Sequence, residues 1–214
     1  MAKSNEINPN KDTILIGFKY DLATEIVFEW ITDDEFLSSH PKENLFRYHD
    51  GSLDDQTKLT SQLKTHKKGV VEVFCGHGSD EALLGPSVNK SEKHYRFYHI
   101  GMISDLPGSL FAFSCDSGEL FGWFYSCSGK NKTFLGFTKK IELPMQVISE
   151  VKNIFQKVAT AIDKEGKITD NHEILFYGLV SKLIKDIEKK IIPCKSPLTT
   201  VSILENYKKC FIKH

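Results

Sequence analysis

The sequence predicts an α/β fold with a mainly parallel sheet flanked by helices. Short apolar runs rich in β-branched and aromatic residues recur over residues 13–138, separated by helix-like or loop-like segments. From residue 144 onward the apolar positions follow the period of amphipathic helices instead. A chain of 214 residues, 40% of them hydrophobic, suits one sizeable core better than two. We therefore expect a flexible leader (1–11), an α/β core (12–143) and a helical C-terminal part (144–214) packed on the same domain.

Five segments have the composition of strands. The run Thr-Ile-Leu-Ile-Gly-Phe at the start of the core is apolar throughout, as expected for a strand covered on both faces. The other four combine apolar, β-branched and aromatic residues in the same way. The predicted strands are residues 13–18, 45–48, 70–74, 110–114 and 133–138.

Helical patterns lie between the predicted strands. Residues 23–37 place their apolar side chains on one helical face, and residues 53–67 form an exposed amphipathic helix with Ser52 as its cap. A further helix begins within residues 119–125. Residues 85–108 contain glycine, proline, lysine and aromatic residues without a simple period, so we expect a long loop or a short hairpin.

The C-terminal part predicts three helices. Gly166 is expected to end the first and Pro193 the second, and a shorter third helix covers residues 200–211. These helices are expected to complete the core, although docking of a partner protein and homodimer formation remain open. The apolar stripes of the first two helices consist of Val147, Ile148, Val151, Phe155 and Val158, and of Leu175, Leu179, Leu183 and Ile187.

Charge and cysteine content narrow the classes of function. Lys+Arg and Asp+Glu both number 28, so no net positive field attracts nucleic acid or anionic lipid. The apolar runs are shorter than the roughly 18 residues of a membrane span, and the first ten residues do not resemble a signal peptide. Five cysteines without a repeated spacing suit a reducing compartment. We expect a cytoplasmic protein with neither nucleic-acid nor membrane partners.

Two predicted strands lead directly into reactive residues. Residues 70–74 precede Cys-Gly-His-Gly at 75–78, and residues 110–114 precede Cys-Asp-Ser-Gly at 115–118. The carboxyl ends of parallel strands meet at one edge of a sheet, which would bring His77 close to Cys115. An imidazole can take the proton of a thiol, and the N–H groups of Gly78 and Cys115 could stabilise an oxyanion. This combination predicts a centre for acyl transfer.

The two motifs resemble those of caspase-like peptidases. Val-Phe-Cys-Gly-His-Gly at 73–78 and Phe-Ser-Cys-Asp-Ser-Gly at 113–118 are similar to the Gly-His-Gly and Ser-Cys-x-Ser-Gly motifs of metacaspases and CHAT peptidases. The resemblance covers roughly residues 13–138. It implies a caspase-hemoglobinase fold with His77 as base, Cys115 as nucleophile and Gly78 as an oxyanion donor. It also implies cleavage of a protein or peptide substrate without metal or cofactor, and motivates a role in stress or defence.

The chain departs from the metacaspase pattern beside the predicted nucleophile. Phe113 stands where metacaspases carry an aspartate that helps to bind basic substrate residues, and Asp116 stands where they usually carry histidine. Asp116, Asp80 and Glu81 could each face a basic substrate residue, although a solvated loop is favoured. The Gln-Ala-Cys-x-Gly motif of caspases is absent, so aspartate specificity is not implied either.

Several other kinds of site have weaker support. A zinc site from Cys75, His77, Cys115 and Cys127 lacks a Cys-x-x-Cys motif or a His pair at ligand spacing. The glycines at 76–78 lack the third glycine of a dinucleotide-binding turn. Aromatic residues at 95–98, with Lys93 and Arg96, could stack on single-stranded nucleic acid, although a loop or substrate groove is favoured.

Two alternatives keep the α/β fold without peptidase chemistry. One is an interaction or scaffold domain that has lost catalysis, and the other is a domain that binds a small molecule at the strand ends. An intact His/Cys pair argues against the scaffold, because such a domain has no chemical need for both residues. Small-molecule binding would be marked by a bound cofactor and by indifference to thiol alkylation.

Overall fold

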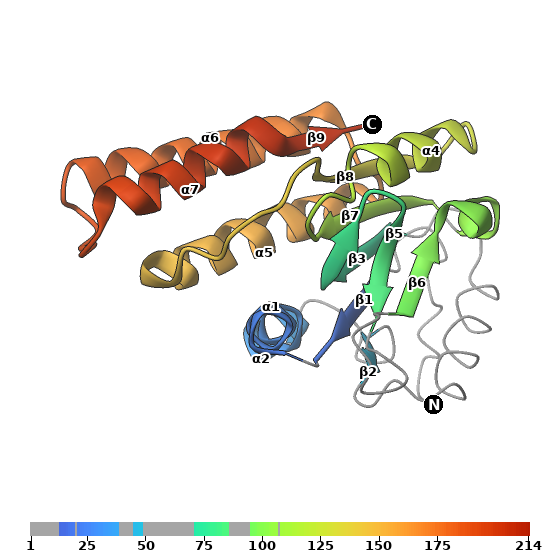
Figure 1. Ribbon diagram of the computed structural model, residues 1–214, viewed down its shortest axis with the longest axis horizontal. Coiled ribbons are helices and arrows are strands. Elements are labelled where there is room, and N and C mark those ends of the chain that lie inside the picture. Colours follow the sequence, from blue (N-terminus) through green and yellow to red (C-terminus); the bar gives the residue numbers. More distant parts are fainter. Residues whose placement is uncertain (1–12, 20, 39–44, 49–70, 86–94, 107) are drawn as a thin grey trace, which may run out of the picture.

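The protein is built around a central six-stranded sheet with elements packed on both faces (Figure 1). The computed structural model describes residues 13–19, 21–38, 45–48, 71–85, 95–106 and 108–214. An α/β fold with a mostly parallel sheet flanked by helices is confirmed. The predicted leader (1–11) and the predicted helix at 53–67 lie outside the described residues.

The sheet contains all five predicted strands and one that was not predicted. The strand order is β2-β1-β3-β7-β8-β9, with β9 antiparallel to β8 and the other pairs parallel. The strands are β1 (Thr13–Phe18), β2 (Leu45–Tyr48), β3 (Val71–Cys75), β7 (Ser109–Phe113), β8 (Thr133–Phe137) and β9 (Phe211–Lys213).

Strand β9 corrects the prediction that the last helix reaches residue 211. Helix α7 (Pro197–Cys210) ends one residue earlier, and Phe211 is buried with 1% of its surface exposed. The chain then pairs with β8, joining Phe211 to Phe137 in the register. Backbone pairing along the β8 edge, which the local sequence does not reveal, decides this conformation.

Strands β1, β3 and β7 are buried on both faces, which explains their apolar runs. Leu15, Val73 and Phe111 belong to the core shared with α1, α5, α6 and α7. Ile16 and Phe74, on the alternate positions, belong to a second core shared with α4 and a smaller sheet. Because successive side chains of a strand point to opposite faces, each of these strands contributes to both apolar cores.

The predicted helix over residues 23–37 is two helices, α1 (Leu22–Thr32) and α2 (Asp34–Ser38). Asp33 between them has an extended ψ of 130°. Its carboxylate accepts hydrogen bonds from the backbone N–H groups of Glu35 and Phe36, both at 3.1 Å. This local capping ends one helix and begins the next.

A small antiparallel sheet follows β3 and contains β4 (His77–Ser79), β5 (Ala82–Gly85) and β6 (Tyr95–His99). Strand β6 lies within the region 85–108 predicted as a loop or hairpin, and it pairs with β5, which lies before that region except for Gly85. Neither β4 nor β5 was predicted. A short 3₁₀ helix continues over Ile100–Asp105. Phe97 and Tyr98 are buried in the second core, so these two rings are not available to stack on nucleic-acid bases.

The remaining helices are α4 (Leu120–Cys127), α5 (Ile148–Glu165), α6 (Asp170–Glu188) and α7. Gly166 ends α5 as predicted, with a φ of 64° that favours glycine. Helix α6 ends at Glu188 rather than at Pro193, because Lys190 adopts a φ of 57° before the proline is reached. Among the described residues, no helix has the length and apolar character needed to cross a membrane.

Candidate active site

Three neighbouring strands end level with one another at the edge that carries the candidate residues. Cys75 at the end of β3 is in register with Gly17 of β1 and with Phe113 of β7. His77 and Cys115 each lie two residues beyond the paired positions Cys75 and Phe113. Both side chains line one pocket of about 220 Å³. The structure therefore brings together the two residues that the strand-end argument selected.

A tight turn after β7 presents Cys115. The Ser114 hydroxyl donates a hydrogen bond of 2.7 Å to the Ser117 hydroxyl, and both side chains are buried. The Gly118 N–H donates to the Phe137 carbonyl at 2.8 Å, which ties the turn to the end of β8. The serines and glycine of this motif therefore shape the backbone that carries the thiol.

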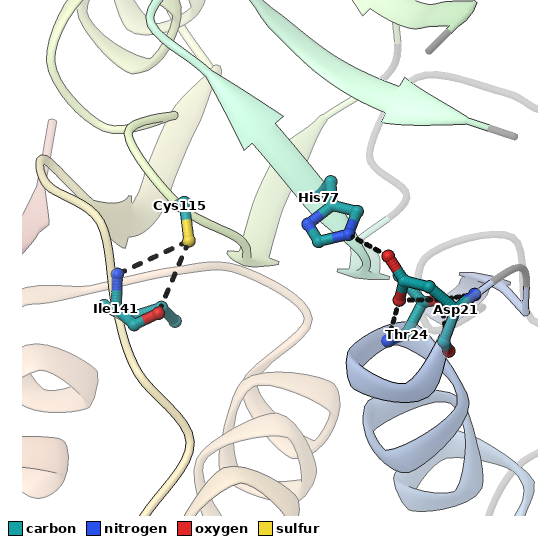
Figure 2. A network of polar contacts seen from close by, with 5 residues as sticks. All are labelled: Asp21, Thr24, His77, Cys115 and Ile141. Carbon is teal, nitrogen blue, oxygen red and sulfur yellow. Dashed lines mark hydrogen bonds and ion pairs between the residues drawn. The ribbon is translucent and has the colours of Figure 1, made fainter. Parts of the chain in front are cut away.

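The Cys115 thiol is held by the backbone of Ile141. Its sulfur lies 3.6 Å from the Ile141 carbonyl oxygen and accepts a hydrogen bond from the Ile141 N–H at 3.4 Å (Figure 2). Burial raises the pKa of Cys115, the Ile141 N–H and Lys140 oppose that effect, and Asp116 adds to it. Within the described residues, no hydrogen bond joins this sulfur to the His77 imidazole. The resting thiol is thus protonated at neutral pH and needs a base to become a nucleophile.

Asp21 holds the imidazole of His77 from the opposite side. The His77 Nε2 atom lies 2.6 Å from Asp21 Oδ2, and Asp21 also accepts the Thr24 N–H at 2.8 Å as the N-cap of α1. Burial alone would raise the pKa of Asp21, but the hydrogen bonds from His77 and Thr24 lower it overall. Because a carboxylate only accepts, Nε2 donates the hydrogen in this contact, and Nδ1 is the second ring nitrogen. In Figure 2 that second nitrogen lies on the Cys115 side of the ring.

Asp21 was not among the residues predicted from the sequence. It lies at the carboxyl end of β1, the strand next to β3, and Thr24 completes a capping box with it. Because Asp21 follows the predicted strand at residues 13–18, its place at this edge of the sheet could be predicted in the same way as those of His77 and Cys115, whereas its contact with His77 could not. The Asp-x-x-Thr pattern at the start of a helix is the local signal.

Gly78 lies against the turn that carries Cys115. A Cβ atom built on Gly78 would approach the Cys115 carbonyl oxygen to 2.3 Å and the Ser114 side chain to 3.0 Å. Any larger residue would force the two strand ends apart. The glycine after the histidine is therefore required by close packing of backbone on backbone, independently of any role as an oxyanion donor.

The three carboxylates considered as contacts for a basic residue do not line the pocket. Glu81 pairs with Arg96 at 3.4 Å on the surface. Asp116 adopts a left-handed φ of 55°, and its pKa is raised by burial and by the nearby charges of Asp80 and Glu119. Asp80, Asp116 and Glu119 therefore lie near one another beside the Cys115 turn, outside the cavity that contains the thiol.

The segment 139–143, which covers the thiol, is attached to helix α7. The Asn206 side chain donates to the Lys140 carbonyl at 3.3 Å, and the Tyr207 hydroxyl donates to the Glu142 carbonyl at 2.7 Å. Tyr207 is itself buried, with 1% of its surface exposed. The C-terminal helix thereby sets the position of the backbone that contacts Cys115.

The described residues do not form a metal centre. No cluster of three or more His, Cys, Asp or Glu side chains among them is arranged to hold a metal ion. Of the four residues considered for zinc, Cys75 is buried in the core, where desolvation raises the pKa of its thiol well above the usual value. Cys127 is exposed on α4. Neither cysteine is placed to ligate an ion together with Cys115 and His77.

No model of a known protein family matches this chain, and no curated protein matches it either.

Proposed function

We propose that this protein is a cysteine peptidase of the caspase-like type, with Cys115 as nucleophile and His77 as general base. The observation that carries the proposal is that a thiol and an imidazole from adjacent parallel strands line one pocket. The hydrogen bond between His77 Nε2 and Asp21 supports it, because a carboxylate that holds one ring nitrogen orients the imidazole and stabilises the imidazolium that a general base becomes. A caspase-hemoglobinase fold is part of the same proposal.

Acylation follows from these roles. His77 Nδ1 takes the thiol proton while the sulfur of Cys115 adds to the carbonyl carbon of the scissile peptide bond. The carbonyl π electrons move to oxygen, where the N–H groups of Gly78 and Cys115 are proposed to stabilise the charge. When the tetrahedral species collapses, the C–N bond breaks and His77 gives its proton to the leaving amine. The product is a thioester on Cys115.

Deacylation uses the same groups in reverse order. Water transfers a proton to His77 as its oxygen adds to the thioester carbon. The C–S bond then breaks, the new carboxylic acid leaves, and the proton returns from His77 to sulfur. Asp21 retains its hydrogen bond to Nε2 throughout and stabilises the imidazolium formed in each half-reaction. No metal or redox cofactor is needed for this balance.

A second candidate is a non-catalytic interaction domain with the same fold. It is favoured by one observation, the pair of contacts between the Cys115 sulfur and the Ile141 backbone. These contacts occupy the thiol in the resting structure, and a domain that uses this edge only for packing would keep them permanently. A peptidase must release the sulfur when substrate binds.

Cleavage of a peptide library separates the two candidates. The wild-type protein is incubated with peptides derived from a whole proteome, and new termini are identified by mass spectrometry. We expect Cys115→Ala and His77→Ala to abolish cleavage while circular dichroism remains unchanged. Cys127→Ala is the matched control, because this exposed cysteine lies on α4, away from the pocket, and its loss should leave cleavage intact.

Two results would contradict the peptidase proposal. If wild type and Cys127→Ala produce no new termini, or if Cys115→Ala still cleaves, the peptidase assignment fails. Absence of cleavage by all four proteins would leave the interaction domain as the better candidate.

A further inference from the structure

The pocket beside Cys115 has apolar walls, which bears on the substrate. Phe113 forms part of it from the end of β7, Val27 and Ala23 from α1, and Ile141 and Leu143 from the segment 139–143. Phe113 and Val27 are buried in the core, Ile141 and Leu143 are half-buried, and Ala23 is exposed at the rim. The cavity is therefore an apolar recess that opens next to the thiol.

The size of the recess indicates what it can hold. Its volume of about 220 Å³ is below the roughly 300–1,000 Å³ of pockets that enclose a drug-sized ligand. It therefore suits a single side chain. A basic side chain placed there would lose its hydration without gaining an opposite charge, because no carboxylate lines the pocket.

The charged side chains near the pocket are not placed to bind a charged substrate residue inside it. Asp80 and Asp116, which a basic substrate residue would require, do not line the pocket. Lys140 does line it, but its side chain is exposed and free to keep its ammonium group in water. Phe113, which does line the pocket, brings an aromatic ring and no charge to its wall.

We infer that the protein acts on substrates with an apolar side chain at the residue whose carbonyl carbon is attacked by Cys115. This inference rests on the proposed peptidase function and specifies its substrate class. The apolar side chain enters the recess between α1 and the segment 139–143, and its burial there holds the acyl carbon beside the sulfur. Discrimination against charged residues comes from the cost of removing their charge from water.

Peptidyl acyloxymethyl ketones test the inference on the intact protein. The probes differ only at the residue next to the ketone, which is leucine, phenylalanine, arginine, lysine or aspartate. The rate of adduct formation on Cys115 is followed by intact mass and peptide mapping, with iodoacetamide as a thiol reagent that lacks a side chain. We expect the leucine or phenylalanine probe to react at least about tenfold faster than the charged probes.

Two variants on the first turn of α1 locate the effect in the recess. Ala23→Phe places a ring at the rim and should slow the apolar probes about tenfold, while iodoacetamide still alkylates Cys115. Leu22→Phe is the matched control, because Leu22 is 73% exposed and does not line the pocket. Its labelling rates should equal those of wild type.

The outcomes distinguish this inference from the function on which it depends. Faster labelling by a basic or acidic probe, or equal effects of the two α1 variants, would overturn apolar selectivity and leave the peptidase assignment standing. If none of the probes labels Cys115 although iodoacetamide does, the peptidase assignment itself fails, and the apolar selectivity with it.

Discussion

His77 Nε2 lies 2.6 Å from the Asp21 carboxylate, which at the same time caps helix α1 through the Thr24 N–H. One side chain thus links the orientation of the proposed base to the start of a helix. The two roles can be separated by mutation, since an asparagine retains an oxygen for the cap but lacks the negative charge.

We expect Asp21→Asn to lower kcat/KM by about 10–100-fold with little change in stability, because the imidazole loses the carboxylate that fixes its tautomer. Asp21→Ala should lose the same activity and, in addition, about 1 kcal/mol of unfolding free energy as the cap disappears. Urea unfolding and peptide cleavage measured on both variants check this. Full activity in the asparagine variant would remove Asp21 from the mechanism.

The burial of Glu72 predicts that the stability of the protein depends on pH. This residue of β3 is fully buried, and burial raises its pKa to about 8 although the Tyr98 hydroxyl donates a hydrogen bond to it. The folded state therefore binds a proton that the unfolded state releases near its ordinary pKa of 4.5. The stabilisation from Glu72 is complete below that value and is lost as pH rises toward 8.

Urea unfolding between pH 6 and 7.5 measures this contribution. From Glu72 we expect the unfolding free energy to fall by roughly 1 kcal/mol per pH unit over this interval. Glu72→Gln keeps the shape without the titration, so its curve should be flatter by that slope. Parallel curves for the two proteins would show that Glu72 is already ionised in the folded state.

Replacing Gly78 by a larger residue should create a packing defect at the site. In Gly78→Ala the new methyl group would meet the Cys115 carbonyl oxygen at 2.3 Å, so the strand ends must separate. We expect a loss of about 1–3 kcal/mol in unfolding free energy together with a loss of activity.

Gly178→Ala is the matched control for that substitution. Gly178 lies within α6, and a Cβ atom there meets nothing within 4 Å. The change should stabilise the protein by about 0.5–1 kcal/mol and leave activity unchanged. Equal effects at the two glycines would contradict the close approach of Gly78 to the Cys115 turn.

The hydrogen bond of the Tyr207 hydroxyl is expected to control access of reagents to the Cys115 thiol. Tyr207→Phe removes the hydrogen bond to the Glu142 carbonyl, loosens the segment 139–143 and should speed alkylation of Cys115 severalfold. The expected cost in unfolding free energy is about 1 kcal/mol. Cys127, exposed on α4, is the internal reference, and its rate should not change. An unchanged ratio of the two rates would mean that α7 does not control access to the thiol.

The sequence by itself determined the five parallel strands of the sheet and the pair at its edge. Segments such as 13–18 and 110–114 are apolar on successive positions, and only burial on both faces accommodates such runs. His77 and Cys115 follow two of these strands directly, so parallel pairing suffices to place them at one edge. These features depend on local periodicity, which a single sequence displays.

Only the tertiary structure decided how that pair is surrounded. The Ile141 contact to the thiol joins residues 26 positions apart, and the bond from Asp21 to His77 joins residues 56 apart. From the sequence, Glu72 has the pattern of an ordinary polar residue in a strand. It is buried because β6 covers it with Tyr98. Strand β9 likewise forms because the β8 edge is open to pairing. Such contacts depend on which segments meet across the fold, and no local pattern of residues specifies that.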